Sequence, residues 1–226
     1  MVKFENVTKK FGDIVALRSV SFEVKPGEFV FVTGPSGAGK TTLVKLILKE
    51  MSPSEGKIEV LGEDLEKISS AKLPFFRQKI GVVFQDFKLL PDRTVFENTA
   101  LPLEVEKKEK KEIEKTVKEV LELVGLLDRQ DLFPLQLAGG ELQRTCLARA
   151  VVSNPKILIA DEPTGNLDPT TSWQIVKLLK KINKMGTTVI MATHNVDIVD
   201  SMRERVIKID KGEVLKDEKE GKYEPI

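Results

Sequence analysis

Residues 34–41 read Gly34-Pro35-Ser36-Gly37-Ala38-Gly39-Lys40-Thr41, which matches the pattern G-x-x-x-x-G-K-S/T. An apolar run at residues 29–32 precedes this stretch, and residues 41–49 after it carry apolar side chains at helical spacing. In a strand–loop–helix unit of this kind, glycines let backbone N–H groups converge on phosphate oxygens, and the helix N-terminus adds partial positive charge. The stretch therefore predicts a nucleotide-binding loop, with an ordinary strand–helix turn as the alternative.

Four polar side chains are candidates for the chemistry. Lys40 is expected to reach the β- and γ-phosphates of the nucleotide, and the hydroxyl of Thr41 is expected to hold Mg²⁺. Asp161 and Glu162 follow the apolar run at residues 157–160, and acids at such a strand end are rarely there for packing. Asp161 could anchor Mg²⁺, and Glu162 could orient or deprotonate an attacking water. Helix-capping or plain surface acids are the alternative interpretation.

The composition excludes several other classes of protein. The chain has 36 Lys and Arg against 35 Asp and Glu, so its net charge of +1 does not favour nucleic acid or an anionic membrane as a partner. One cysteine, Cys146, and one histidine, His194, exclude a disulfide framework and a metal site built from several Cys or His residues. The N-terminus lacks a signal-peptide pattern, and no apolar run approaches the roughly 18 residues of a membrane span. We therefore expect a cytoplasmic protein that reaches a membrane only through a partner.

The hydrophobic pattern predicts alternating strands and helices and hence an α/β fold with parallel strands. The expected strands are residues 2–7, 20–24, 29–32, 58–61, 80–84, 157–160, 187–192 and 206–209. The expected helices are residues 41–49, 104–124, 141–152, 171–184 and 197–202. We interpret residues 1–226 as one domain, with a core at 1–85 and 155–226 and an inserted helical subdomain at approximately 86–154. The polar tail from Lys211 onward is expected to fray.

A third motif, Leu137-Ala138-Gly139-Gly140-Glu141, resembles the LSGGQ signature of ATP-binding-cassette (ABC) ATPases. The order of the remaining motifs is similar to that family too: the phosphate loop, Gln85 after a strand, the signature, Asp161-Glu162, residues 165–168 and then His194. The resemblance covers nearly the whole chain. It implies the P-loop ABC ATPase fold, in which a mostly parallel core sheet is joined by an antiparallel β part and an inserted helical subdomain.

The resemblance also implies ATP and Mg²⁺ as cofactors and a role for each matching residue. Phe11 would stack on adenine, although a plain core Phe is the alternative. Gln85 would sense Mg²⁺ and the attacking water, and His194 would contact the γ-phosphate. The other implied contacts to ATP come from Gly34, Pro35, Ser36, Gly37, Ala38, Gly39 and Thr42. Catalysis would then rest on Glu162, His194, Gln85 and Lys40, and the Mg²⁺ ligands would be Thr41, Gln85 and Asp161.

By the same resemblance, the signature residues Ala138, Gly139, Gly140 and Glu141 would bind the ATP held by a second copy of the chain. Asp168 would contact that opposite subunit, so the active form would be a homodimer closed by ATP. Ala138 stands where the family has Ser, and Glu141 where it has Gln. Because one hydroxyl contact to the γ-phosphate is lost, a weaker or slower ATP-closed dimer is expected.

Residues 73–98, above all Asp92-Arg93-Thr94-Val95, are similar to the bacterial cell-division ATPases of this family. That similarity implies a homodimer bound to the inner face of the cell membrane through an FtsX-like integral membrane protein, whose motion regulates cell-wall hydrolysis. The partner would dock in a groove near residues 85–90 and the helical insertion. Phe75, Phe76 and Phe87 are candidate contacts, with a core role as the alternative for Phe75 and Phe76.

Four other functions remain as alternatives. The first is the ATPase subunit of a lipoprotein-release or macrolide/peptide exporter, whose relatives share several of the same motifs. The second is a slow, ATP-gated scaffold of the division machinery, which the loss of the signature hydroxyl mildly favours. A soluble ABC ATPase acting on nucleic acid or ribosomes is disfavoured, because the chain has neither two cassettes nor a long coiled coil. A small-molecule kinase is disfavoured because it would leave the signature without a purpose.

Overall fold

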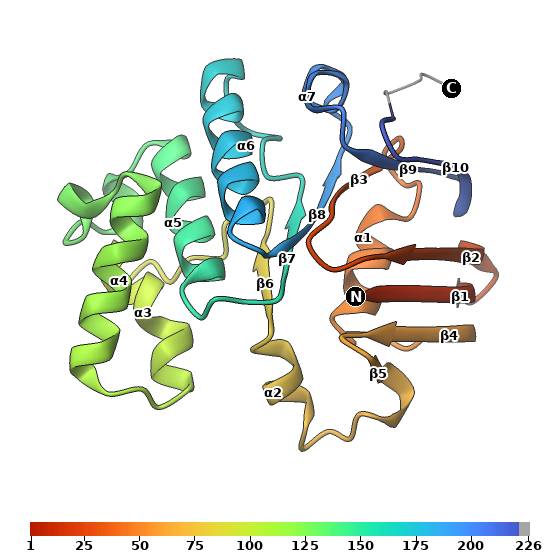
Figure 1. Cartoon of the computed structure of the whole chain (residues 1–226), viewed down its shortest axis with the longest axis horizontal. Helices are drawn as coiled ribbons and strands as arrows, with labels where there is room; N and C mark the ends of the chain where they lie inside the picture. The colour runs from red at the N-terminus through yellow and green to blue at the C-terminus, as the bar shows by residue number, and fades with distance from the viewer. Residues whose placement is uncertain (222–226) are drawn as a thin grey trace.

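The computed structural model describes residues 1–221, and its centre is a six-stranded sheet in the order β10-β9-β3-β8-β7-β6 (Figure 1). The five strands from β9 to β6 run parallel, and β10 pairs antiparallel with β9 at one edge. β3 and β8 are buried along their whole length, as expected for central strands of a sheet covered on both faces. The strands are β3 (Phe29–Thr33), β6 (Ile80–Val83), β7 (Ile157–Asp161), β8 (Thr188–Thr193), β9 (Arg205–Asp210) and β10 (Glu213–Glu218).

The two faces of this central sheet pack against different helices. Val30 and Val32 point to a core shared with α1 (Lys40–Ile47), whereas Phe29 and Phe31 point to a core shared with α6 (Pro169–Lys184) and α7 (Val196–Met202). This alternation follows from the period of two along a strand. α1 is therefore held rigidly at the end of β3, which fixes the position of the loop between them.

A second, antiparallel sheet in the order β2-β1-β4-β5 lies on the other side of α1 (Figure 1). Its strands are β1 (Val2–Phe11), β2 (Ile14–Val24), β4 (Glu55–Val60) and β5 (Glu63–Asp64). The rings of Phe4 and Phe22 stack with their centroids 4.7 Å apart on its inner face. A short segment with η1 (Leu65–Lys67) and α2 (Leu73–Arg77) leads from this sheet to β6.

The helices at the left of Figure 1 form a group with a small core of its own. They are α3 (Val95–Val105), α4 (Lys110–Val124), η2 (Leu127–Arg129), η3 (Pro134–Gln136) and α5 (Gly139–Val151). Leu103 on α3, Leu121 on α4 and Ala148 on α5 are buried together there. α5 also contributes Cys146 and Leu147 to the core beneath α6, so this helix connects the group to the central sheet.

The prediction of one helix over residues 104–124 is wrong. α3 ends at Val105 and α4 begins at Lys110, and Lys107 between them adopts the left-handed conformation with φ of 59°. Residues 106–109 are all charged, so they offer no apolar side chain that would hold a continuous helix against the core. The expectation that the tail frays from Lys211 onward is also wrong for residues 213–218, because β10 pairs with β9.

Candidate nucleotide site

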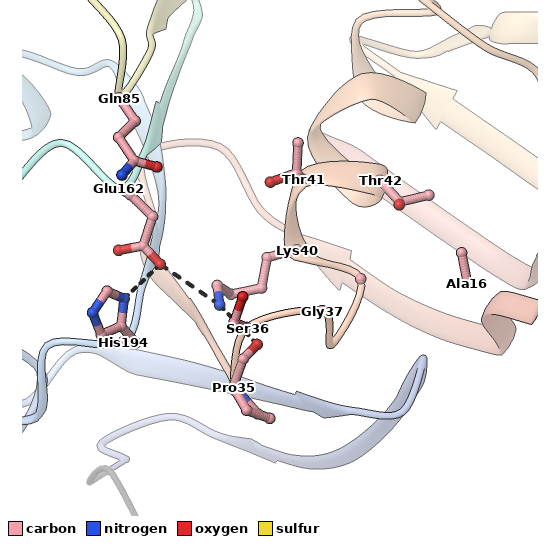
Figure 2. Close-up of a pocket in the computed structure, with 11 residues that line it drawn as sticks. Ala16, Pro35, Ser36, Gly37, Lys40, Thr41, Thr42, Gln85, Glu162 and His194 are labelled. Atoms are coloured by element: carbon pink, nitrogen blue, oxygen red, sulfur yellow. Dashed lines mark hydrogen bonds and ion pairs between the residues drawn. The ribbon is translucent and has the colours of Figure 1, made fainter. Parts of the chain in front are cut away.

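A cavity of about 540 Å³ lies beside the phosphate loop and the carboxyl ends of the central strands (Figure 2). It draws together residues from segments far apart in the chain, because parallel strands end at the same edge of the sheet. Its lining consists of Ala16, Pro35, Ser36, Gly37, Gly39, Lys40, Thr41, Thr42, Gln85, Glu162 and His194. All of these except Ala16 were predicted from the sequence as site residues.

The phosphate loop requires glycine at two positions. Gly34 leaves β3 with φ of 152°, and a Cβ atom there would lie 2.1 Å from the carbonyl oxygen of Ile209. Gly39 precedes α1 with φ of 110°, and its Cβ would lie 2.8 Å from the carbonyl oxygen of Ala16. These close approaches keep the loop backbone against β2 and β9, so the first turn of α1 opens into the cavity. Ala38, which the sequence also assigned to the site, is buried beneath the loop.

The ammonium group of Lys40 is bound by the loop itself. Lys40 Nζ donates to the carbonyl oxygens of Gly34 at 2.7 Å and Pro35 at 3.1 Å, and it lies 3.6 Å from Oε1 of Glu162. A buried cation needs such partners, because its desolvation is otherwise costly. Negatively charged phosphate oxygens entering the cavity would be stronger acceptors for the same three donors than the carbonyls are.

Glu162 lies between two cationic or potentially cationic groups (Figure 2). Its Oε1 atom is 2.9 Å from Nδ1 of the exposed His194, in addition to its contact with Lys40. The residue adopts the left-handed conformation with φ of 48°, which is uncommon for a non-glycine residue and is typical of functional sites. The second oxygen, Oε2, is buried and has no hydrogen-bond partner in the part of the chain that the structure describes.

Asp161 lies one residue earlier, at the end of β7, and contacts the phosphate loop. Its Oδ2 accepts a hydrogen bond from the hydroxyl of Thr41 at 3.2 Å, whereas Oδ1 is buried without a partner among residues 1–221. Burial raises the pKa of Asp161, and the neighbouring Glu162 carboxylate adds to this, although Thr41 and Lys40 oppose it. A carboxylate in this state is stabilised by a bound cation.

The donor set fits Mg²⁺, which prefers hard oxygen ligands and usually takes one or two carboxylates together with substrate phosphates. The orphaned Oδ1 of Asp161 and the adjacent Thr41 hydroxyl supply such oxygens. No group of three or more His, Cys, Asp or Glu side chains within residues 1–221 could hold a metal by itself. Gln85 lines the cavity just beyond the end of β6. Its Nε2 atom packs against Gly165, because a Cβ atom built at Gly165 would lie only 3.4 Å from it.

The structure does not bring the signature into this cavity. Gly139 and Gly140 form the first turn of α5, and a Cβ at Gly140 would meet Cγ2 of Thr171 at 2.5 Å. Ala138 is the N-cap of α5, and its backbone N–H donates to Oε2 of Glu141 at 2.9 Å. The binding role of these four residues therefore stays a prediction that requires a second copy of the chain.

Two further predicted residues lie outside the cavity as well. Phe11 ends β1 and is 46% exposed, so the alternative of a core Phe is wrong, while stacking on adenine stays a prediction. Asp168 is the N-cap of α6, where its Oδ1 accepts a hydrogen bond from the Thr171 backbone N–H at 3.0 Å. Hydrogen bonding to Thr171 holds the pKa of Asp168 below its usual value.

Ala16 was missed, because a small apolar residue within a strand forms part of no motif.

Fold and site together define a P-loop ATPase in which a helical group is inserted between two strands of the parallel sheet. A protein-family description, "ABC transporter", matches residues 17–165 of the chain. The chain belongs to the ABC transporter family, and the resemblance predicted from its motifs is confirmed. No helix within residues 1–221 is both long enough and apolar enough to cross a membrane.

Several curated relatives match the chain over nearly its full length. It is 52% identical over 224 residues to the cell division ATP-binding protein FtsE of Bacillus subtilis (strain 168), covering 99% of this chain and 98% of that one. It is 46% identical over 225 residues to FtsE of Mycobacterium tuberculosis, covering 99% and 98%. FtsE of Escherichia coli (strain K12) is 46% identical over 213 residues, covering 94% and 96%.

Solved structures show the same fold. The dimeric ATP-binding cassette MJ0796, in a post-hydrolysis state bound to ADP and Pi, aligns with a TM-score of 0.88 and 39% identity, covering 99% of this chain and 100% of that one. The structure of cbiO1 from Clostridium perfringens, part of the ABC transporter complex cbiONQ, aligns with a TM-score of 0.89 and 31% identity over 96% and 88% of the two chains. The expected fold class, with its mixed sheets and inserted helices, is confirmed.

Proposed function

We propose that this chain is the ATP-hydrolysing subunit of a membrane ABC complex that acts in bacterial cell division. Two copies would close around ATP, and an FtsX-like integral membrane protein would carry their motion to the control of cell-wall hydrolysis. The bridge from Glu162 to both Lys40 and His194, in a cavity walled by a phosphate loop, is the observation that supports ATP hydrolysis. The full-length similarity to cell division ATP-binding proteins supports the biological role.

The geometry suggests what each residue does when ATP enters. The phosphates replace the carbonyls of Gly34 and Pro35 as acceptors for Lys40, which releases the ammonium from the loop and from Glu162. Thr41, Asp161 and Gln85 would hold Mg²⁺, and the ion would supply positive charge beside the phosphates. Glu162 then orients the attacking water and accepts its proton at the orphaned oxygen, while His194, whose Nδ1 lies beside Glu162, would contact the γ-phosphate.

The signature's place outside the cavity of its own chain supports the proposed dimer. The first turn of α5 carries unpaired backbone N–H groups, which suit the negative charge of a γ-phosphate held by the second copy. Phe11 would stack on adenine from its exposed position, and Asp168 would face the opposite subunit. The dimeric form of the MJ0796 cassette supports this arrangement by analogy.

The partner would dock in an apolar groove of about 590 Å³ between the central sheet and the helical group. Its lining includes Pro74 on α2, Ile80 on β6 and Val105 on α3. Phe75 is 66% exposed and suits a contact role, but Phe76 is only 2% exposed and packs in the core shared with α1. Phe76 is therefore a core residue rather than a partner contact, and Phe87 is half buried. This docking would place the protein at the inner face of the membrane.

The catalytic test compares two variants. Glu162→Gln keeps the size of the side chain and removes the base, so it should bind ATP normally, hydrolyse it poorly and accumulate as a dimer. Lys40→Ala should lose ATP binding instead. Near-normal hydrolysis by Glu162→Gln would contradict the role of Glu162.

The biological test uses Glu162→Gln as bait for an ATP-dependent pull-down from membranes of the source organism. Retention of a four-span membrane protein with a large external domain supports the cell-division function. Retention of a lipoprotein- or drug-export permease would keep the site assignments and move the function to transport.

The ATP-gated scaffold is a second candidate, and the missing hydroxyl at Ala138 is the observation that favours it. Turnover is measured with and without the captured membrane partner. Stimulation by the partner supports a motor, whereas slow turnover that the partner leaves unchanged supports the scaffold.

A further inference from the structure

The loop that follows Gln85 has a strained backbone. Phe87 has φ of 59° and Lys88 has φ of 51°, so two consecutive non-glycine residues adopt the left-handed conformation. Such residues are uncommon, and they persist only where surrounding contacts impose the conformation. The contacts that impose it here therefore control the backbone two residues from a predicted catalytic side chain.

Those contacts come from α5. The guanidinium of Arg149 donates from Nη1 to the carbonyl oxygen of Lys88 at 2.6 Å and from Nη2 to that of Phe87 at 2.9 Å. The Phe87 carbonyl also lies 3.1 Å from Sγ of Cys146, one turn earlier on the same helix. Burial raises the pKa of Cys146 to about 12, so the thiol keeps its proton at neutral pH and donates it to this carbonyl.

The guanidinium suits this task better than any other side chain. Its planar fork presents several N–H donors in fixed directions, so one side chain can donate to two neighbouring carbonyls at once. The loop is anchored on its other side by Lys88 itself, whose Nζ lies 4.1 Å from the centre of the Phe84 ring. Phe84, Phe87 and Lys88, which flank Gln85 in the sequence, are therefore each held by a contact.

We infer that Arg149 is a positioning residue for ATP hydrolysis: it holds the Phe87 and Lys88 carbonyls and thereby keeps Gln85 directed into the nucleotide cavity. The inference rests on the proposed role of Gln85. Because α5 begins at Gly139, the same rigid helix carries the signature at one end and this clamp near the other. Arg149 therefore connects the helix that carries the signature to the loop that carries Gln85.

The test compares Arg149→Met, Arg149→Lys and the control Arg77→Met. Arg77 is a matched control, because it also donates two bonds to backbone carbonyls, those of Leu48 and Lys49, and it lies outside the nucleotide cavity. For each full-length variant, kcat and KM for ATP are measured with Mg²⁺, and hydrogen exchange is followed by mass spectrometry.

Arg149→Met is expected to lower kcat by about 10- to 100-fold, the range caused by small misplacement of a catalytic group. Its KM should stay within about 2-fold, because the phosphate loop that binds ATP is untouched. Exchange should rise in a peptide covering residues 85–90 and stay unchanged in a peptide covering residues 29–41. Arg149→Lys should recover part of the lost kcat, since one ammonium can still reach one carbonyl, and Arg77→Met should keep the kcat of the wild type.

Three results would overturn the inference. A wild-type kcat for Arg149→Met would show that the clamp does not position Gln85, provided that Gln85→Ala is impaired. Faster exchange throughout Arg149→Met would show a general loss of stability instead of a local one. If Gln85→Ala itself hydrolyses ATP at the wild-type rate, the proposed role of Gln85 fails, and the role of Arg149 fails with it.

Discussion

Restoring the missing hydroxyl of the signature, by Ala138→Ser, should have two separable effects. Ala138 is the N-cap of α5 with an extended backbone, φ −71° and ψ 159°, and its side chain accepts no hydrogen bond. Glu141 already accepts from the Ala138 N–H, which is half of a capping box. A Ser hydroxyl could accept from the Glu141 N–H and still donate its own proton to a phosphate, so both contacts can form at once.

The size of each effect follows from these contacts. Replacing Ala by a good N-cap stabilises a protein by about 1 kcal/mol, which raises Tm by about 2–4 °C in a chain of this length. A hydrogen bond to a charged group contributes about 1.5–3 kcal/mol. A dimer with two such contacts should therefore have a dissociation constant lower by about 100-fold or more.

The two effects are separated by Ala138→Gly, because Gly is a good N-cap that carries no hydroxyl. Thermal unfolding without nucleotide measures the capping effect, and sedimentation with ATP in a Glu162→Gln background measures dimerisation. Both variants should raise Tm, and only Ala138→Ser should tighten the dimer. Equal dimerisation of the two variants would refute the contact to the phosphate, and an unchanged Tm in both would refute the capping argument.

Two further predictions concern buried titratable groups. The pKa of Asp161 is raised in the folded protein, so the folded state binds the proton of this carboxyl group more tightly than the unfolded chain does. The free energy of unfolding therefore falls as the pH rises above about 4, where the unfolded chain loses this proton. Asp161→Asn should therefore raise the Tm of the nucleotide-free protein at pH 7, with a smaller gain near pH 4. The same substitution should abolish Mg²⁺-dependent hydrolysis. A lower Tm at pH 7 would contradict the destabilising effect of the buried carboxylate. With its pKa raised to about 12 by burial, Cys146 should resist maleimide at pH 7.5 in the native protein and react fully in denaturant. Rapid labelling of the native protein would contradict it.

The predicted residues that the structure brings together at the cavity are those that a short local pattern encodes. The glycines at 34 and 39 are required by backbone approaches to Ile209 and Ala16, so their spacing carries structural information by itself. Asp161 and Glu162 could be placed because an apolar strand must end where its polar residues begin. Each of these signals depends on only a few neighbouring residues.

The parts that were missed depend on contacts between distant segments. Arg149 was not singled out, because its acceptors are main-chain carbonyls some sixty positions away. Every residue has such a carbonyl, so no residue type in the sequence indicates this contact. The break between α3 and α4 was missed for a different reason: charged residues are compatible with both helix and turn, and packing decided between them. The start of α3 could have been found, since Thr94 and Glu97 form a capping box.

The strand order has a consequence for how the chain is made. β3 lies between β8 and β9, and all its residues are buried. At about 5–20 residues per second, the ribosome adds Thr188 roughly 8–30 s after Thr33. For that time the apolar strand β3 has neither β8 nor β9 beside it. During this interval Glu162 and His194 are absent or unplaced. Until then the nucleotide cavity is incomplete and β3 lacks both of its strand neighbours, so its exposed apolar side chains favour aggregation of the nascent chain.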